Sequence, residues 1–333
     1  MVEPSDEAPA GPAENEAAEA GAEPWNVEPE QRSVAVPAAL HGQRLDKAVV
    51  AMATEFSRSH LQGLIGGGHV RVDDHVVTVP ARKVRAGQRI DLDLAPTAES
   101  RAFRPEPIPL RIVHEDEHIL VLDKPAGLVV HPAAGNWSGT LLNGLLHRDA
   151  SAAALPRAGI VHRLDKDTSG LMVVGRTLAS VTALTRAIAA REVHREYLAI
   201  VHGDVGAAPF SIDAPIGRDP RSRVRMAVVA SGKPARTDVL AVARGDTLSG
   251  VRCTLHTGRT HQIRVHLAAR GHPLVADATY GGAAALGLER QALHAARLAF
   301  AHPVSGAPVA FFAEPPLDFG SAWKALTGAS ATA

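Results

Sequence analysis

Apolar positions repeat first with a helical and then with a strand period between residues 34 and 95. In the segments 45–52 and 61–65 they recur three or four residues apart, which predicts two helices, the second capped by Ser57. Alternating apolar residues then predict three short strands, at 70–72, 76–79 and 90–94. The pattern predicts a small α+β domain in which two helices pack on a sheet.

From residue 110 to residue 327 the same patterns predict more strands than helices. Strands are predicted at 111–114, 118–122, 160–164, 171–174, 196–201, 223–229, 235–242, 251–256, 293–301 and 307–312. Helices are predicted at 141–146, 178–191, 260–270 and 318–326, the third capped by Thr260. Because hairpin turns connect most of the strands, the predicted fold class is α+β with a mixed, largely antiparallel central sheet.

Polar segments separate and flank these two domains. Residues 1–33 are rich in Ala, Glu, Pro and Gly and predict a disordered acidic tail. Residues 96–109 predict a proline-rich linker, and 328–333 a short terminal tail. Residues 1–30 carry nine acids and no Lys or Arg, so the rest of the chain has 35 basic against 26 acidic residues. That excess suits a polyanionic partner, although charge alone is a weak signal.

Several classes of protein are disfavoured. The chain has no apolar run of 18 residues and no basic segment followed by an apolar one, so we expect a cytoplasmic protein without a membrane span. The single cysteine, Cys253, excludes an internal disulfide and a cysteine-rich zinc site. No glycine-rich phosphate loop opens a helix, and no histidine pair has metal-binding spacing, so we expect neither a cofactor nor a metal. We also expect a monomer.

A cluster of charge begins near the end of the predicted strand 160–164 and precedes the apolar run 171–174. It contains Arg163, Asp165, Lys166 and Asp167, and Thr, Ser and Gly follow it. A carboxylate at the end of a buried strand, with cations beside it, is a candidate for catalysis. The same composition is typical of a hairpin turn, so both interpretations stay open at this point.

Two other segments supply residues that would complete a site around Asp165. Residues 257–266 predict a tight turn leading into a mostly buried helix that carries Arg264. A buried arginine needs a carboxylate partner, and an arginine beside a carboxylate keeps it ionised and oriented. Tyr197 is one of only two tyrosines and lies in an alternating strand. Its ring would suit a pocket for a planar base, and a core position is the alternative.

The sequence resembles two known families, on several long motifs in the same order. Residues 34–95 are similar to the alpha-L RNA-binding domain named after a ribosomal small-subunit protein. The remainder resembles the RluA/RluD-type pseudouridine synthases that act on ribosomal RNA. The motifs that carry the second likeness are Asp123 to Pro132, His162 to Gly170, Arg195 to Tyr197, Thr257 to His266 and His272 to Val275 with Asp277 and Tyr280-Gly281.

These resemblances imply a role for each matching residue. Asp165 matches the catalytic aspartate, and Arg163 the arginine that fills the space left in the RNA helix by the extruded uridine. Tyr197 matches the tyrosine that stacks on the base, and Arg264 the basic residue that pairs with the aspartate. The implied activity is isomerisation of uridine in RNA, with 23S ribosomal RNA as the expected substrate, without a cofactor; Asp165 either attacks the sugar or assists elimination. Candidate RNA-binding residues of the first domain are Arg44, Lys47, Arg58 and Arg71.

Two rival functions remain. The first is a non-catalytic RNA-binding or ribosome-assembly protein, which would have no need of Asp165, Tyr197 and Arg264 together. The second is a carboxylate-based hydrolase such as a nucleosidase, which usually needs two opposed carboxylates. Asp167 is the nearest second carboxylate in sequence, and its direction cannot be read from the pattern.

Overall fold

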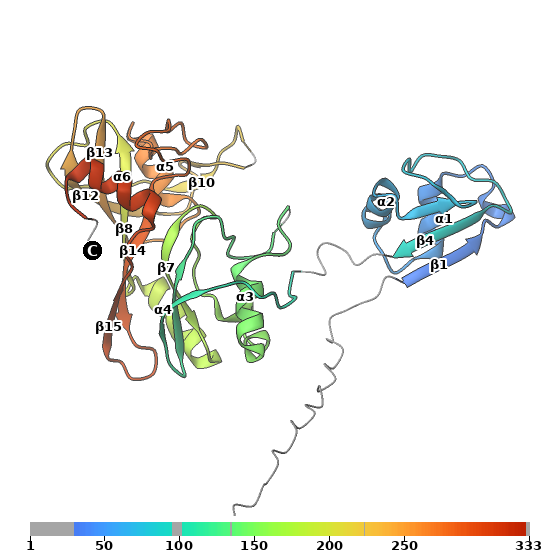
Figure 1. The fold of residues 1–333 in the computed structure, drawn as a ribbon, viewed down its shortest axis with the longest axis horizontal. Coiled ribbons are helices and arrows are strands. Elements are labelled where there is room, and N and C mark those ends of the chain that lie inside the picture. Colours follow the sequence, from blue (N-terminus) through green and yellow to red (C-terminus); the bar gives the residue numbers. More distant parts are fainter. Residues whose placement is uncertain (1–29, 95–101, 134, 223, 331–333) are drawn as a thin grey trace, which may run out of the picture. The chain divides into compact units, whose positions relative to one another are not determined.

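The computed structural model describes residues 30–94, 102–133, 135–222 and 224–330. The chain divides into two compact units, residues 1–97 and 98–333, which we describe separately as the amino-terminal and carboxy-terminal units (Figure 1). Of the predicted tails and linker, residues 1–29, 96–101 and 331–333 lie outside the described residues. Among those that are described, no helix is long and apolar enough to cross a membrane.

The amino-terminal unit has the predicted helix pair on one face of a small sheet. Its elements are β1 (Glu30–Ala35), η1 (Ala38–Leu40), α1 (Leu45–Met52), α2 (Arg58–Gly66), β2 (Val70–Val72), β3 (His75–Val76) and β4 (Arg89–Leu94). The strand order is β1-β4-β2-β3, and all pairs are antiparallel. Leu45 and Leu61 of the helices share a buried cluster with Val70 and Ile90 of the sheet. Ser57 caps α2 by accepting a hydrogen bond from the His60 amide at 3.3 Å.

Two predictions for this unit were wrong in detail. Strand β1 begins at Glu30, inside the segment predicted as a disordered tail, and its six residues pair in register with β4 from Glu30–Leu94 to Ala35–Arg89. Its side chains are mostly exposed, so backbone hydrogen bonds hold it and no apolar alternation marks it. The strand predicted at 76–79 is shorter, and β3 ends at Val76.

A nine-stranded sheet forms the centre of the carboxy-terminal unit. Its strands are β5 (Arg111–Glu115), β6 (Ile119–Lys124), β7 (Ser169–Gly175), β8 (His194–His202), β9 (Phe210–Asp213), β12 (Arg236–Arg244), β13 (Leu248–Leu255), β14 (Leu293–Ala301) and β15 (Pro308–Phe312). The order is β5-β6-β7-β14-β8-β13-β12-β9, and β15 also pairs with β14. Within the described chain only β7 and β14 pair in parallel, so the predicted mixed, largely antiparallel α+β class is confirmed.

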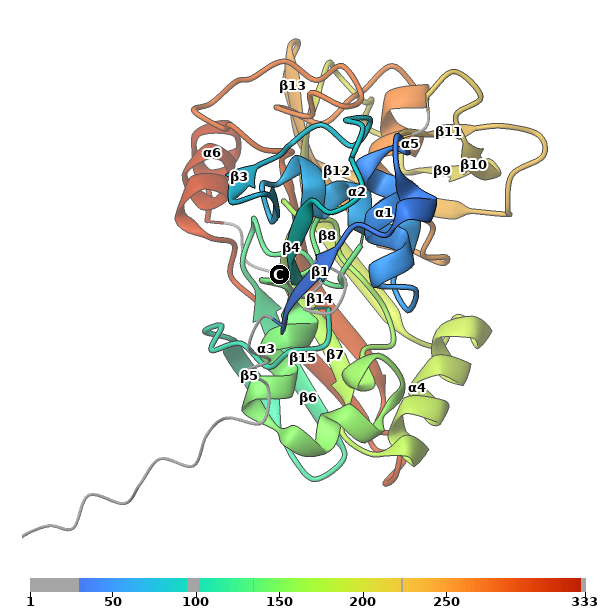
Figure 2. The same cartoon turned by 90° about the vertical axis from the view of Figure 1, so that its right-hand side faces the viewer.

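Helices cover both faces of this sheet. The principal helices are α3 (Leu141–Arg148), α4 (Leu178–Ala190), α5 (Gln262–Ala269) and α6 (Leu317–Thr327), with 3-10 turns η3 (Ala150–Ala154) and η4 (Pro156–Gly159). Apolar residues of α3 and α5 share a cluster with Tyr197 and alternate residues of the sheet. On the opposite face α6 packs near β12 and β13 (Figure 1), and α4 lies along β7 (Figure 2). Tyr197 therefore faces the α3–α5 side.

The structure differs from the prediction at several places in this unit. Residues 160–164 do not form a strand; only Ile160 makes an isolated bridge, to Val174. Of the strand predicted at 223–229, residue 223 lies outside the described residues, and the strand observed is β11 (Met226–Val228), which pairs with the unpredicted β10 (Ile216–Arg218). The helix predicted from Thr260 begins at Gln262, and its N-cap is His261, whose φ of 56° is left-handed.

The predicted linker also ends earlier than expected. Ala102 is buried, and the side-chain amide of Asn143 in α3 donates to the carbonyl oxygen of Arg104 at 2.8 Å. The Gly139 amide donates to the Glu106 carboxylate at 2.9 Å. Residues 102–109 are therefore packed into the carboxy-terminal unit, because the Arg104 carbonyl oxygen and the Glu106 carboxylate have partners on α3 and in the turn before it.

Candidate active site

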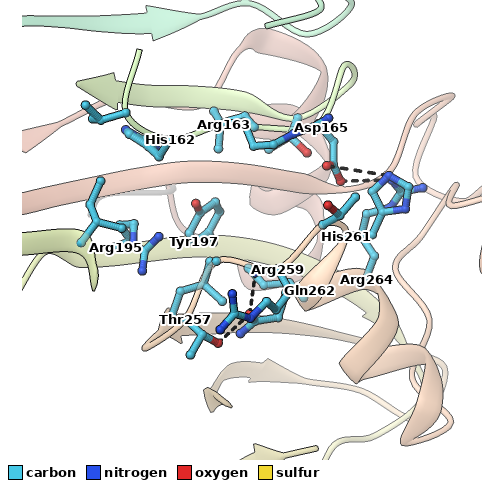
Figure 3. Close-up of a pocket in the computed structure, with 18 of the residues that line it drawn as sticks. His162, Arg163, Asp165, Arg195, Tyr197, Thr257, Arg259, His261, Gln262 and Arg264 are labelled. Atoms are coloured by element: carbon cyan, nitrogen blue, oxygen red, sulfur yellow. Dashed lines mark hydrogen bonds and ion pairs between the residues drawn. The ribbon is translucent and has the colours of Figure 1, made fainter. Parts of the chain in front are cut away.

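A pocket of about 630 Å³ opens on the α3–α5 side of the central sheet (Figure 3). Its walls come from the loop 160–165, the end of α4, strand β8 and the segment 255–264. These segments are far apart in sequence, and the strand order of the sheet brings them together. The pocket contains all four residues predicted for the carboxy-terminal site, namely Arg163, Asp165, Tyr197 and Arg264.

Asp165 is held at the pocket wall by a turn and by a buried lysine. The Thr168 amide donates to the Asp165 carbonyl oxygen at 3.1 Å and closes the turn. The ammonium group of Lys124, fully buried at the end of β6, donates to the carbonyl oxygens of Pro125, Leu128 and Lys166 at 2.8–2.9 Å. The turn and the candidate catalytic carboxylate are therefore one feature, since the turn fixes where Asp165 points.

Arg264 joins Asp165 to a second, more deeply buried carboxylate. Its Nη1 donates to Asp165 Oδ2 at 3.1 Å, which is the contact predicted from sequence. Its Nε and Nη2 donate to the two oxygens of Asp277 at 2.7 and 2.8 Å. Burial opposes the charge on Arg264, but the hydrogen bonds to Asp277 and the charge of Asp165 raise its pKa. Asp277 was not among the predicted site residues, although it belongs to one of the motifs that carry the resemblance and a buried arginine needs carboxylate partners.

A histidine and a tyrosine complete the surroundings of Asp165. His261 Nε2 lies 3.9 Å from Asp165 Oδ1, and its Nδ1 lies 2.9 Å from the Tyr280 hydroxyl. Burial outweighs the attraction of Asp165 and lowers the pKa of His261, so the imidazole is neutral at neutral pH. The Arg264 guanidinium lies 5.1 Å from the Tyr280 ring centroid, in cation–π geometry. Arg264 is thus the principal cation in contact with Asp165.

Tyr197 and the remaining arginines define what the pocket could accept. Tyr197 is 5% exposed, and burial raises the pKa of its phenol, so it stays protonated at neutral pH. Among the described residues that line the pocket, Asp165 is the only acid, whereas six are arginines: Arg157, Arg163, Arg191, Arg195, Arg259 and Arg264. Of the two neighbours in the charged cluster, Arg163 is exposed and Asp167 does not line the pocket. A buried aromatic ring with surrounding guanidinium groups suits a planar base attached to a polyanion.

The candidate RNA-binding residues of the amino-terminal unit do not form one group. Arg44 and Arg58 both donate to the buried carboxylate of Asp46 at 3.0 Å, which holds the two guanidinium groups side by side at the helix pair. Lys47 lies on α1 and donates to the side chain of Gln43. Arg71 alternates with Val70 and Val72, which face the helices, so it lies on the other face of the sheet, 3.6 Å from Asp93. Arg71 therefore lies apart from the other three candidate RNA-binding residues.

No group of three or more His, Cys, Asp or Glu residues in the described ranges is arranged to hold a metal ion.

Comparisons with known proteins agree with this arrangement. A family model described as RNA pseudouridylate synthase matches residues 118–269, and an S4 domain model matches residues 43–90. The chain is 45% identical over 315 residues to the ribosomal large subunit pseudouridine synthase D of Xanthomonas campestris pv. campestris, which covers 91% of this chain and 94% of that protein. It is 49% identical over 298 residues to the protein of the same name from Neisseria meningitidis serogroup B, covering 85% and 78%.

Two solved structures are also similar to this chain. Human RNA Pseudouridylate Synthase Domain Containing 1 matches with a TM-score of 0.50 and 30% identity, over 63% of this chain and 85% of that one. Human RNA Pseudouridylate Synthase Domain Containing 4 has a TM-score of 0.51 at 23% identity, a likeness of fold, over 65% and 92%. Fold and pocket thus define an RNA pseudouridine synthase, an isomerase with an S4 domain before it. Within this class the chain belongs to the RluA/RluD-type family.

Proposed function

We propose that this protein converts specific uridines of large-subunit (23S) ribosomal RNA to pseudouridine, with Asp165 as the catalytic group. The relatives named above are described as ribosomal large subunit pseudouridine synthases, which supports this substrate. The observation that carries the proposal is the contact of Asp165 with Arg264 in a pocket that also contains Tyr197 and five further arginines. The reaction breaks the bond between uracil N1 and the sugar C1′, rotates the base and rejoins it through C5.

The four site residues have distinct proposed roles. Asp165 acts on the sugar, and Arg264 orients its carboxylate through the 3.1 Å hydrogen bond. Tyr197 stacks on the uracil ring, because it is the buried aromatic side chain of the pocket. Arg163 is exposed and occupies the gap that the extruded nucleotide leaves in the RNA. Extrusion costs a few kcal/mol, and contacts between phosphates and the pocket arginines offset that cost.

The amino-terminal unit is proposed to deliver the RNA. Arg44, Lys47 and Arg58 lie on the helix pair, where Asp46 fixes two of them. We assign the RNA-binding domain to residues 30–94 and the synthase domain to 102–330. The protein would act in the cytoplasm as a monomer, without a cofactor.

Tritium release tests the catalytic assignment. Ribosomal RNA labelled with tritium at C5 of uridine loses the label when C5 bonds to the sugar. We expect release by the wild-type protein, none by Asp165→Asn, and release close to wild type by the matched control Asp167→Asn, whose carboxylate does not line the pocket. Release by Asp165→Asn at the wild-type rate would contradict the assignment. Mapping pseudouridines in a deletion strain would then identify the target uridine.

The same reaction distinguishes the two rivals. A non-catalytic RNA-binding protein would release no tritium, and a nucleosidase would liberate free uracil. The hydrolase is disfavoured because Asp165 is the only acid among the described lining residues. The other nearby carboxylate, Asp277, is 1% exposed and engages Arg264 with both oxygens, so it cannot oppose Asp165 across a substrate.

A further inference from the structure

Arg195 is a buried cation that has no partner in the described part of the chain. It lies on β8 two residues before Tyr197, so both side chains face the pocket, as Figure 3 shows. Arg195 is 5% exposed, and its Nε atom is fully buried without a hydrogen-bond acceptor. No described residue forms an ion pair or hydrogen bond with its guanidinium group. A buried charge is costly unless it is paired, so this position is unfavourable in the free protein.

The surroundings of Arg195 hold its charge in place without neutralising it. A Cβ atom on Gly258 would lie 2.9 Å from Arg195 Nη1, so the guanidinium group lies against the backbone of the 257–259 turn. Burial and the charge of Arg195 lower the pKa of His162 to about 3, so that imidazole is neutral. By contrast, Arg264 contacts two carboxylates, and Arg259 Nε donates to the Pro234 carbonyl oxygen. Arg195 is thus the pocket arginine that is both buried and unpaired.

The missing partner of Arg195 should lie inside the pocket. A backbone phosphate would stay near the solvent side, where exposed arginines such as Arg163 lie. The group that reaches as deep as Tyr197 is the extruded base itself, on the role proposed above for that ring. Uracil offers two exocyclic oxygens, O2 and O4, as hydrogen-bond acceptors, and it carries them next to the bond that breaks.

We propose that Arg195 donates hydrogen bonds to an exocyclic oxygen of the reacting uracil and stabilises the negative charge that develops there. This inference rests on the proposed function. When the N1–C1′ bond breaks, its electron pair stays on uracil and the charge spreads over N1, O2 and O4. C5 then bonds to C1′, C5 loses its proton and N1 gains one, so the reaction is balanced without an oxidant or reductant. A fixed cation at the oxygen where charge develops lowers the barrier.

The variant Arg195→Met separates this role from a structural one. We expect kcat to fall by about 100-fold, as for the removal of a donor to a developing oxyanion, with KM for RNA nearly unchanged. The melting temperature should stay equal or rise, because the substitution removes an unpaired buried charge. The matched control Arg297→Met removes an arginine of β14 that pairs with Glu196 outside the pocket, and it should retain wild-type kcat. If Arg195→Met is insoluble, Arg195→Lys replaces it, with the same expected fall in kcat because the planar fork is lost.

Sulfur substitution in the RNA tests the contact directly. RNA fragments that contain the mapped target uridine would be made with 2-thiouridine or 4-thiouridine there, since sulfur is a weak acceptor. Wild type should slow by about tenfold or more at one of the two positions, whereas Arg195→Met should show little further effect at that position.

Equal sulfur effects in wild type and variant at both positions would overturn the proposal. So would unchanged kcat in Arg195→Met, or a fall in kcat that accompanies a lower melting temperature and is the same for every substrate. Pseudouridine formation by wild type with either of these results would refute the role of Arg195 and leave the proposed function intact. Absence of pseudouridine from the wild-type reaction would overturn the proposed function and this inference with it.

Discussion

Asp277→Asn should destabilise the carboxy-terminal unit and slow the reaction, although Asp277 does not line the pocket. The substitution keeps the shape of the side chain but replaces one acceptor oxygen by an amide donor, which then faces the N–H groups of Arg264. Both hydrogen bonds are short, and Asp277 is 1% exposed, so water cannot substitute for the lost oxygen. Breaking a buried pair from one side costs about 3–5 kcal/mol. For a unit of this size that corresponds to a melting temperature lower by roughly 6–20 °C.

Urea unfolding followed by tryptophan fluorescence would measure this cost, since Trp137 and the buried Trp323 lie in the carboxy-terminal unit. The kcat of the variant should fall by about tenfold to 100-fold, because Arg264 would no longer be held in position to orient Asp165.

The pair Arg290–Asp318 offers a matched control. Arg290 Nε and Nη2 donate to the two carboxylate oxygens of Asp318 at 2.6 and 3.0 Å, the same bidentate geometry, but the Asp318 side chain is 43% exposed. Asp318→Asn should cost no more than about 1 kcal/mol, and kcat should not change. Equal stability losses in the two variants would show that burial does not set the cost. Wild-type stability in Asp277→Asn would refute the reasoning about Arg264 altogether.

Four further results are expected. Lys124→Met should cost about 3–5 kcal/mol in urea unfolding, because three buried carbonyl oxygens lose their donor; an unchanged midpoint would contradict this. Gly170→Ala should destabilise by about 3 kcal/mol or more in the same assay, since its φ is 115° and a Cβ would lie 2.3 Å from the Ala295 carbonyl oxygen. Hydrogen bonds, chiefly from a neighbouring arginine, lower the pKa of Asp46 below its usual 3.8, so the stability it contributes is present above that pH and is lost as pH falls further; acid titration of Asp46→Asn should lack this loss. Deletion of residues 34–95 should weaken RNA binding and flatten its salt dependence in titrations at several salt concentrations, and unchanged affinity and slope would rule out delivery by this unit.

The parts of the fold that could be predicted from sequence are those where side-chain periodicity and burial coincide. Strands β4 and β8 and helices α1 and α4 have strong apolar periods and lie where they were expected. The run 160–164 has apolar residues at both ends, and Ile160 and Leu164 are indeed buried, but the segment pairs with no neighbouring strand along its length. Apolar residues report burial, and burial in a packed loop gives the same signal as burial in a strand. Strand β1 shows the reverse case, because its ladder of backbone hydrogen bonds leaves no trace in side-chain polarity.

The site could be predicted only as far as single residues carried a signal. The contact between Arg264 and Asp165, residues 99 apart, was expected because a buried arginine needs a carboxylate. The second partner, Asp277, lies in a loop whose path depends on the whole sheet, so no local pattern predicts that it pairs with Arg264. The face of the sheet on which Arg71 lies could have been predicted from sequence. Arg71 alternates with Val70 and Val72, whose side chains face the helices.

Lys124 supplies the loop that carries Asp165 with a cation that cannot dissociate. Three carbonyl oxygens from residues 125, 128 and 166 converge on one ammonium group, much as they would around a bound alkali-metal ion. A soluble ion would have a dissociation constant, and the order of the loop would then vary with ionic composition. Because this cation is covalently part of β6, its effective concentration at the loop is set by the fold. Chelators and dialysis should therefore leave the position of the Asp165 carboxylate unaltered.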